Sequence, residues 1–418
     1  MKVLVLGAGV IGITTAYYLH KAGHEVVVVD RQPGAGLETS FANAGGVCPG
    51  FAGPWAAPGI PGKALRWLLA RHAPLSIRPQ LDAQQWRWLA AFVCNCTAER
   101  FTRNKETMQR IAHYSKACLV ALREEVGIAY DEGTGGVLQI FRTEAEVENA
   151  RRAAKVLKSF NVAHRLIGSK EVIEIEPGLG DSTIPIAGGL HLPDDETGDC
   201  HLFTARLAAL LRKTGVIFRF DTPIQKLLSD GVSLNGVATT DGTLTADRYV
   251  VALANDAPQL LRPLGIDVPV YPVKGYAITI ENKQPSKAPR SSVMDEHSKV
   301  MVTHLGTRVR SAGVAEVGGY DRGIDLRKIE SVRETTRALF PHAGDYAQAS
   351  QWAGLRPMTP DGPPYLGLTP LRNLLLNIGH GSNGWTQACG CGRIIADLVS
   401  GRPSDIDLAG LTFDRRDA

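Results

Sequence analysis

Hydrophobic residues in the first thirty positions fall into three blocks with different spacing. Residues 2–6 form a short apolar run rich in valine and leucine, which is typical of a buried strand. Over residues 13–21 the apolar side chains recur at helical spacing, and Gly23 closes the pattern. A second apolar run over residues 26–29 ends at Asp30. The pattern predicts a strand, a tight turn, a helix and a second strand.

Three glycines separate the first strand from the helix at the spacing G-x-G-x-x-G: Gly7, Gly9 and Gly12. Gly7 permits a sharp turn, Gly9 lets the backbone approach a diphosphate, and Gly12 lets the helix pack close to the strand. The diphosphate would lie at the helix N-terminus, where free N–H groups and the helix dipole favour negative charge. Asp30 lies where an acidic residue accepts hydrogen bonds from a ribose hydroxyl pair. These features predict a dinucleotide site.

Two later stretches belong with this unit. Residues 248–253 form a third apolar strand of the doubly wound type. Residues 373–380 form an apolar strand that leads through a glycine turn into a helix over 386–401, so a second helix N-terminus would point at the same ligand. Between these stretches the periodicity predicts helices over 82–127 and 144–160 and a second sheet that begins near residue 268.

The composition narrows the class of protein. With 44% hydrophobic and 21% charged residues over 418 positions, the chain has material for two domains with ample cores. A net charge of +4, without a basic block between aromatic residues, argues against nucleic acid as a partner. The seven cysteines are odd in number and scattered, and the two C-x-C pairs lack a matching cluster of ligands, so we expect no disulfide framework and no metal.

Membrane contact is left open by the pattern. No apolar run reaches the roughly 18 to 20 residues of a membrane helix, and the first strand begins at Lys2 without a signal peptide. We therefore expect a cytoplasmic protein. The stretch around residues 66–71 mixes tryptophan, leucine and arginine, which suits either peripheral contact with the cytoplasmic face of the inner membrane or packing on the protein itself.

The segment after Asp30 is rich in glycine, alanine, serine and threonine, so it is a poor core element and is suited to wrap a cofactor. Its hydroxyl and amide side chains would donate hydrogen bonds, and its small residues would allow close backbone approach. An ordinary surface loop is the alternative. The residues concerned are Thr39, Ser40, Asn43, Ala44, Gly45 and Gly46.

Seven stretches in order along the chain carry a resemblance to a known family: GAGVIG, ETSFANAG, PWAAPGIP, LPDDETGDCHLFT, YPVKGY, WAGLRPMTPDG and GHGSNGWTQACG. The chain resembles the bacterial D-amino acid dehydrogenase small subunits, within the D-amino acid oxidase and glycine oxidase group of FAD enzymes. The resemblance implies FAD bound non-covalently, since Met358 stands where the sarcosine oxidase branch carries a flavin-linked cysteine.

The family fold implies an α/β protein with a Rossmann-type FAD-binding domain and a discontinuous α+β substrate domain built on a mixed or antiparallel sheet. The FAD-binding domain would comprise residues 1–49, 198–269 and 350–418. The substrate-binding domain would comprise residues 50–197 and 270–349. The predicted cofactor contacts are Gly7, Gly9, Val10, Gly12, Asp30, Arg31, Thr39, Ser40, Asn43, Ala44, Gly45, Gly46, Ile224, Gly379, Gly381, Ser382, Asn383, Gly384, Trp385 and Thr386.

Substrate binding requires a group that holds a carboxylate, and a bidentate arginine suits its planar shape. The resemblance places the carboxylate-binding arginine of glycine oxidase at Arg356, although an arginine before a proline is by itself typical of an exposed loop. Tyr276 either adds a hydroxyl to that carboxylate or is a core aromatic. His380 either lies beside the flavin or has only a structural role. His304 and Asn383 depart from the dehydrogenase pattern, and together with Met294 they are predicted to line a pocket for another amine.

The implied reaction is oxidative deamination of a D-amino acid to a 2-oxo acid and ammonia. Hydride would pass from Cα to flavin N5, and electrons would go on to a quinone or another acceptor. The alternatives are an oxidase or dehydrogenase of glycine, sarcosine or a cyclic amino acid such as D-proline or hydroxy-D-proline, and a flavin-binding subunit without turnover. The pattern leaves the oligomeric state open.

Overall fold

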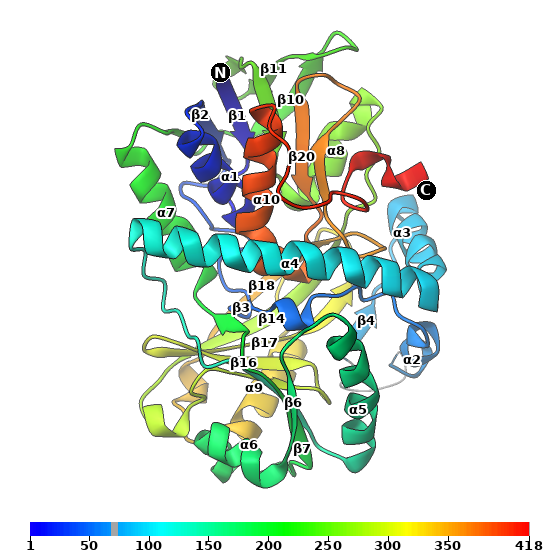
Figure 1. Ribbon diagram of the computed structural model, residues 1–418, viewed down its shortest axis with the longest axis vertical. Coiled ribbons are helices and arrows are strands. Elements are labelled where there is room, and N and C mark those ends of the chain that lie inside the picture. Colours follow the sequence, from blue (N-terminus) through cyan, green and yellow to red (C-terminus); the bar gives the residue numbers. More distant parts are fainter. Residues whose placement is uncertain (68–73, 418) are drawn as a thin grey trace.

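The computed structural model describes residues 1–67 and 74–417 of the chain (Figure 1). The stretch predicted to contact a membrane or pack on the protein lies partly at 68–73, outside the described residues, so that prediction stays open. Two regions with separate sheets are joined by long connections. The long helix α4 (Ala98–Val126) runs across the molecule where the regions meet.

Within the described residues, one sheet has the strand order β19-β20-β13-β1-β2-β9. The pairs from β20 to β9 are parallel, and β19 is antiparallel to β20. The predicted first, second and third strands thus lie next to one another. This sheet comprises β1 (Lys2–Leu6), β2 (Glu25–Val29), β9 (Ile217–Arg219), β13 (Arg248–Val251), β19 (Tyr365–Leu368) and β20 (Leu374–Ile378).

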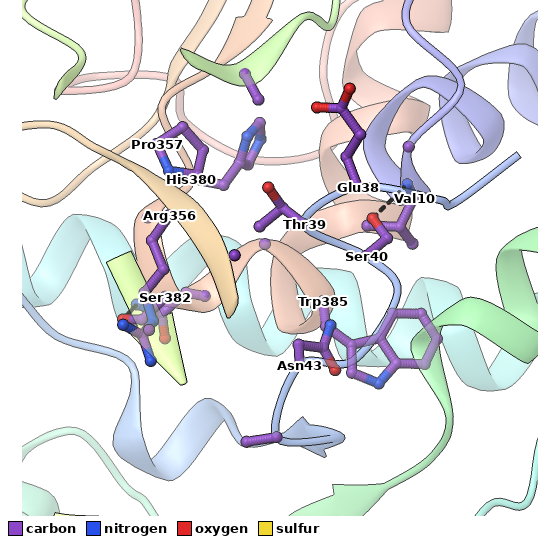
Figure 2. Close-up of a pocket in the computed structure, with 18 of the residues that line it drawn as sticks. Val10, Glu38, Thr39, Ser40, Asn43, Arg356, Pro357, His380, Ser382 and Trp385 are labelled. Carbon is purple, nitrogen blue, oxygen red and sulfur yellow. Dashed lines mark hydrogen bonds between the residues drawn. The ribbon is translucent and has the colours of Figure 1, made fainter. Parts of the chain in front are cut away.

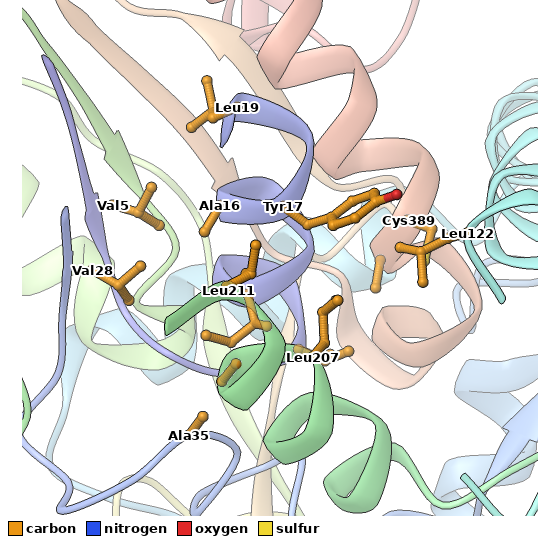
Figure 3. Packing of buried hydrophobic residues seen from close by; sticks show 14 of the residues in the cluster. Val5, Ala16, Tyr17, Leu19, Val28, Ala35, Leu122, Leu207, Leu211 and Cys389 are labelled. Carbon is orange, nitrogen blue, oxygen red and sulfur yellow. The ribbon is translucent and has the colours of Figure 1, made fainter. Parts of the chain in front are cut away.

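Helices α1 (Val10–Lys21), α7 (Cys200–Lys213) and α10 (Gly384–Val399) cover one face of this sheet and share a core with α4. Figure 3 shows Ala16 of α1 on the side of Val5 and Val28, whereas Tyr17 extends toward Cys389 of α10 and Leu122 of α4. Glycines in α10 permit this packing, because a Cβ at Gly390 would lie 2.7 Å from the Ser115 Cα and one at Gly392 would lie 2.8 Å from the Thr14 carbonyl carbon. The apolar faces of these helices bury the C-x-C pair of α10 as free thiols.

The second sheet has the order β18-β14-β17-β16-β15-β5-β7-β6, and β4 pairs with β17. Most neighbours are antiparallel; β15–β5 and β17–β4 are parallel. The mixed sheet beside a Rossmann-type sheet confirms the predicted fold class. Its strands are β4 (Leu75–Ile77), β5 (Val137–Phe141), β6 (Arg165–Gly168), β7 (Gly188–Leu192), β14 (Tyr271–Glu281), β15 (Ser292–Asp295), β16 (Val300–Leu305), β17 (Arg308–Val317) and β18 (Ser350–Met358).

Sheet membership divides the chain somewhat differently from the predicted domain boundaries. Strand β18, assigned by residue range to the FAD-binding domain, pairs along its full length with β14 of the second sheet. Helix α4, assigned to the substrate side, packs against α10 and the Rossmann core. The division into two domains stays a prediction, and these two elements are the places where the regions interlock.

The remaining helices connect the two sheets, and the remaining strands form separate small sheets, β10-β11-β12 and β3-β8. Helix α9 starts directly after Asp325, because the Asp325 side chain accepts a hydrogen bond from the Arg327 N–H and caps the helix. These elements are α2 (Ile60–Trp67), α3 (Ala83–Cys94), α5 (Glu144–Ser159), α6 (Ser169–Ile175), α8 (Ala257–Leu261), α9 (Leu326–Leu339), β3 (Gly46–Val47), β8 (Glu196–Thr197), β10 (Ile224–Ser229), β11 (Leu234–Thr239) and β12 (Gly242–Leu244).

Asp195, in the turn after β7, carries a buried carboxyl group whose ionisation opposes folding. Its Oδ1 accepts a hydrogen bond from the Gly50 N–H at 3.0 Å, but its Oδ2 has no partner among the described residues. Burial raises the pKa of Asp195 to about 7. Since the unfolded carboxyl has a pKa of about 4, the folded protein binds more protons between these values, and the free energy of unfolding falls as the pH rises through this window.

We therefore expect Asp195→Asn to raise the melting temperature, relative to the parent protein, by about 2–3 °C more at pH 8 than at pH 5. The asparagine keeps an oxygen for Gly50 and carries no charge to bury. Thermal unfolding of both proteins at the two pH values measures this difference. An equal difference at both pH values would contradict the buried-carboxyl assignment.

Candidate active site

A cavity of about 720 Å³ lies between the glycine turn after β1 and the strands of the second sheet. Its wall is formed by the loop over residues 30–46, by β14, β17 and β18, and by the turn before α10. Figure 2 shows Arg356 and the Val10–Ser40 pair on opposite sides of the view, with Thr39 between them. Segments distant in sequence therefore meet around one ligand-sized space.

The first glycine turn is built for close packing and for an anion. Gly7 has φ +110°, and a Cβ there would lie 2.5 Å from the Ala252 carbonyl oxygen. A Cβ at Gly12 would lie only 1.8 Å from the Gly7 carbonyl oxygen, so Gly12 sets the approach of α1 to β1. At Gly9 the nearest protein atom to a Cβ is the Ser40 Oγ at 3.5 Å, so Gly9 faces the cavity. The Val10 N–H donates to the Ser40 Oγ at 3.0 Å.

A charged cluster surrounds the end of β2. The Asp30 carboxylate accepts hydrogen bonds from the Ala8 N–H at 2.6 Å and the Gln32 N–H at 2.8 Å. Burial raises the pKa of Asp30 above its ordinary value. Arg31 forms ion pairs with Glu38 at 2.7 Å and Asp256 at 2.8 Å. The Asp30 oxygens retain further lone pairs, so the carboxylate that steadies the turn can also accept from a ligand hydroxyl.

The second glycine turn presents the N-terminus of α10 to the same cavity. Gly381, Ser382, Asn383 and Gly384 line the space, and Gly381 has the left-handed φ of +55°. His380 is buried here, and burial lowers its pKa to about 3, so the ring is neutral. Its Nε2 has no hydrogen-bond partner among the described residues. This turn therefore offers backbone N–H groups, a helix dipole and an unsatisfied buried nitrogen to a bound group.

Arg356 lies on β18, not in the exposed loop that its local sequence favours. Its guanidinium donates to the Val314 carbonyl oxygen at 3.3 Å and lies 5.9 Å from the Trp55 ring centroid. Among residues 1–67 and 74–417, no carboxylate forms an ion pair with it. Burial lowers the pKa of Arg356 to about 10, which leaves it charged at neutral pH. An unpaired, partly buried cation that lines a cavity is suited to an anionic ligand.

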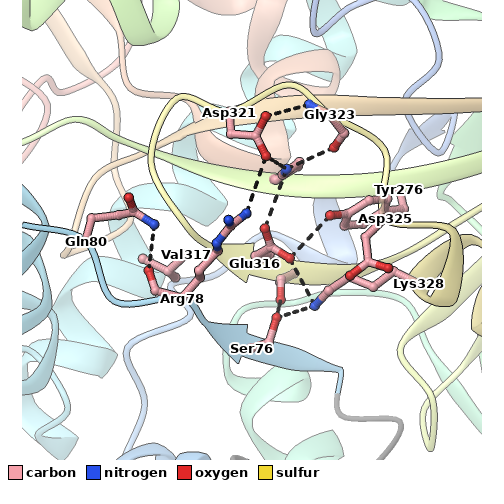
Figure 4. Close-up of polar contacts among 12 residues, drawn as sticks. Ser76, Arg78, Gln80, Tyr276, Glu316, Val317, Asp321, Gly323, Asp325 and Lys328 are labelled. Atoms are coloured by element: carbon pink, nitrogen blue, oxygen red, sulfur yellow. Dashed lines mark hydrogen bonds and ion pairs between the residues drawn. The ribbon is translucent and has the colours of Figure 1, made fainter.

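Tyr276 also lines the cavity, but its hydroxyl donates to the Glu316 carboxylate at 3.3 Å. Figure 4 shows Tyr276 and Lys328 both directed at Glu316. Lys274 lies 3.5 Å from the same carboxylate and 3.0 Å from Asp321. The hydroxyl is thus part of a buried ionic network in the sheet, and the ring is the part of Tyr276 that forms cavity wall.

We expect Tyr276→Phe to change KM for an amino acid by less than about threefold, because the phenyl ring keeps the wall in place. The same substitution removes a donor from a buried carboxylate, so the free energy of unfolding should fall by about 1–3 kcal/mol. Steady-state kinetics and denaturant unfolding measure the two effects. A large increase in KM with unchanged stability would instead show that the hydroxyl contacts substrate.

His304 is a predicted site residue that the structure does not place in the cavity. Its Nε2 lies 3.2 Å from the Asn282 Nδ2. On the same strand Met301 lines the cavity and the Thr303 hydroxyl donates to the Ala44 carbonyl, and neighbouring residues of a strand face opposite sides. His304 therefore faces away from the cavity, and we assign it no substrate contact. The direction of its side chain depends on the strand register, which the local sequence does not give.

The other predicted residues divide into two groups. Gly12 and Gly379 do not line the cavity; each packs against the protein, since a Cβ at Gly379 would lie 2.7 Å from the Thr359 Cγ2. Thr39 lines it while its hydroxyl donates to the Leu355 carbonyl at 2.8 Å. The predicted cofactor residues that line the cavity are Gly7, Gly9, Val10, Asp30, Arg31, Thr39, Ser40, Asn43, Ala44, Gly45, Gly46, Ile224, Gly381, Ser382, Asn383, Gly384, Trp385 and Thr386.

Several lining residues were not predicted from the sequence. Trp55 and Trp352 flank the arginine end, and Glu38 lies at the opposite end beside Arg31. Trp55 lies within the PWAAPGIP motif and Trp352 within WAGLRPMTPDG, so those motifs carried a signal. Glu38 likewise opens the ETSFANAG motif, but its ion pairs with Arg31 and Arg322 depend on the fold, because Arg322 is distant in sequence.

A ligand-sized cavity beside a glycine turn at the end of a parallel-sheet strand is the arrangement typical of a dinucleotide-binding protein. The chain belongs to the family described as FAD dependent oxidoreductase, whose model matches residues 2–398. FAD is accordingly the cofactor. The residues present fit it, with two helix N-termini, a glycine cradle without Cβ atoms and the unsatisfied His380 Nε2 on the cavity wall.

Relatives with curated names cover nearly the whole chain. The chain is 51% identical over 415 residues to a D-amino acid dehydrogenase of Rhodopseudomonas palustris, covering 99% of this chain and 98% of that protein. It is 48% identical to a D-amino acid dehydrogenase of Agrobacterium fabrum, covering 99% of each. Among solved structures, glycine oxidase from Geobacillus kaustophilus has a TM-score of 0.77 at 23% identity, covering 99% of this chain and 98% of that one, which shows a shared fold.

Among the described residues, no helix is both long and apolar enough to cross a membrane. Over the same described ranges, no three histidine, cysteine, aspartate or glutamate residues lie together in a way that could hold a metal ion.

Proposed function

We propose that this protein oxidises D-amino acids at FAD to 2-oxo acids and ammonia and passes the electrons to a separate acceptor. The support from sequence is the near-complete coverage at about half identity by proteins named D-amino acid dehydrogenase. When bound, the flavin supplies the acceptor for a hydride, which carries two electrons from the substrate Cα. The imino acid formed then takes up water and releases ammonia, which balances the reaction.

The observation that carries the proposal is the state of Arg356. Its guanidinium is partly buried at the cavity wall and is held by a carbonyl oxygen instead of a carboxylate, so its charge is not neutralised by the protein. A substrate carboxylate would supply the missing charge through two parallel hydrogen bonds. We assign Arg356 the role of holding and orienting the amino acid through that group.

Other residues of the chain would orient the cofactor and shape the pocket. The α10 N-terminus would stabilise negative charge on the bound ring system through its free N–H groups. Trp55, Tyr276 and Trp352 would wall the substrate end and exclude water. Asn383 and Met294 also line the cavity and are proposed to contact the substrate side of the ring. FAD is proposed to be held without a covalent bond.

The acceptor, the location and the assembly are finer parts of the proposal. We propose a quinone or another electron acceptor, and peripheral contact with the cytoplasmic face of a membrane. The exposed side chains of Leu81, Trp86 and Val93 around α3 support the membrane contact. Sedimentation with vesicles of anionic lipid measures that contact, and Trp86→Ser should weaken it. Retention in the supernatant with and without lipid would refute it.

The decisive experiment is anaerobic bleaching of the flavin by a panel of D- and L-amino acids, including glycine, sarcosine and the proline and hydroxyproline isomers, followed by admission of air. We expect bleaching by D-isomers and slow reoxidation in air. Rapid recovery with hydrogen peroxide would show an oxidase, and preferential bleaching by glycine or a cyclic amino acid would shift the substrate. Absence of bleaching by every amine would refute the proposal.

A further inference from the structure

Strand β17 contains a backbone irregularity directly opposite the proposed carboxylate-binding arginine. Lys274 of β14 pairs with Glu316, whereas Tyr276, two residues on, pairs with Gly313, so β17 carries an extra residue at this point. Val314, within the extra stretch, has φ +56°. A β-branched residue in the left-handed region is strained by about 1–3 kcal/mol and persists only where the surrounding structure imposes it. Such bulges re-aim groups near active sites.

The group that the bulge re-aims is the Val314 carbonyl. That oxygen accepts the hydrogen bond from the Arg356 guanidinium at 3.3 Å. In a regular antiparallel ladder a strand carbonyl lies in the plane of the sheet and bonds to the neighbouring strand. The unusual φ of Val314 accompanies a carbonyl that instead meets a side chain which lines the cavity.

A glycine on the neighbouring strand leaves the space that the guanidinium occupies. Gly275 of β14 lies beneath the guanidinium: a Cβ there would be 2.4 Å from the Cζ, Nη1 and Nη2 of Arg356. Its register partner on β18 is Gly354, where a Cβ would be 2.0 Å from the Trp352 ring. The paired glycines leave space across two strands, and the Arg356 guanidinium and the Trp352 ring occupy the positions that their Cβ atoms would take.

We propose that Gly275 and the Val314 bulge form a seat that positions Arg356 for the substrate carboxylate, an inference that rests on the proposed function of Arg356. The β14 backbone at Gly275 supports one side of the guanidinium, and the Val314 carbonyl accepts a hydrogen bond from it. The seat uses a neutral carbonyl, so it restrains the side chain without cancelling its charge. A carboxylate in the same place would hold the arginine more strongly but would compete with the substrate.

The seat makes Gly275 and Val314 positioning residues, with a defined kinetic signature. Gly275→Ala displaces the guanidinium by adding one methyl group where its atoms lie. We expect KM for a D-amino acid and the inhibition constant of propanoate, a carboxylate without an amine, both to rise about tenfold or more, while kcat falls less than about threefold. The flavin content should be unchanged.

A double-mutant cycle separates positioning from general damage to the sheet. In an Arg356→Lys background, where no planar guanidinium rests on the seat, Gly275→Ala should change KM less than about threefold. The matched control is Gly189→Ala in β7 of the same sheet, away from the cavity lining, where the added methyl group meets the Val172 side chain at 2.9 Å. It should leave propanoate inhibition unchanged.

Val314→Pro is the second variant, because proline fixes φ near −65° and turns the carbonyl away from Arg356. It too should weaken propanoate inhibition about tenfold or more if the seat is real. The proposed seat would be overturned if Gly275→Ala and Arg356→Lys have additive effects on KM. It would also be overturned if folded Gly275→Ala or folded Val314→Pro leaves propanoate inhibition unchanged, or if neither variant folds. If Arg356→Ala itself leaves propanoate inhibition unchanged, the proposed function of Arg356 fails instead, which is a separate result.

Discussion

Replacing Arg356 by alanine should lower kcat/KM for a D-amino acid by about 10³-fold, while the purified protein stays yellow. Two charge-assisted hydrogen bonds to the carboxylate, at about 2 kcal/mol each, amount to about 4 kcal/mol of lost transition-state stabilisation. The flavin should remain, because Arg356 lies on the opposite side of the view in Figure 2 from Val10, which follows the first glycine turn. Steady-state kinetics and the flavin absorption spectrum measure the two quantities.

Two controls sharpen this result. Arg356→Lys keeps the charge but not the fork of donors, so we expect an intermediate loss of about 10- to 100-fold. Arg327→Ala removes an arginine whose side chain is 92% exposed, away from the cavity lining, and should leave the kinetics unchanged. If Arg356→Ala has the kinetics of the parent protein, the carboxylate is held elsewhere.

Substituting valine for Gly9 should yield folded protein with at least about tenfold less bound FAD, because the added side chain would occupy the space that the diphosphate needs. The protein itself has room there, since the nearest atom to a Cβ at Gly9 is the Ser40 Oγ at 3.5 Å, an ordinary contact. Absorbance of the purified protein at flavin wavelengths, normalised to protein concentration, gives the occupancy. Circular dichroism reports whether the fold is kept.

Comparison of Gly12→Ala with Gly9→Val distinguishes loss of the fold from loss of the cofactor alone. A Cβ there would lie 1.8 Å from the Gly7 carbonyl oxygen, so α1 could not keep its approach to β1. We expect that variant to lose stability and cofactor together, whereas Gly9→Val loses the cofactor alone. Normal FAD content in Gly9→Val would refute the assignment of the first glycine turn to the diphosphate.

Local patterns were reliable where one segment contains the whole signal. The glycine spacing around Gly7 and the apolar runs of the Rossmann strands are each contained within a few residues, and the structure has these elements close to the predicted positions.

Predictions were weaker where the direction of a side chain depends on the register between strands that are distant in sequence. His304 faced away from the cavity because the neighbouring Thr303 faces the Ala44 loop. The Tyr276 hydroxyl bonds to Glu316, a partner forty residues away on β17. Neither direction can be read from the local pattern, since one step along a strand moves a side chain to the other face.

The sequence by itself determined the dinucleotide-binding unit, because glycine spacing and apolar periodicity act over a few residues. The resemblance carried by its seven motifs indicated the family and the segments that would carry the chemistry. Tertiary structure alone decided what those segments do together. Only the pairing of β14, β17 and β18 brings the Val314 carbonyl, Gly275 and Arg356 into contact. Their positions along the chain give no hint of it, since the free charge of that arginine depends on which group long-range strand pairing places beside it.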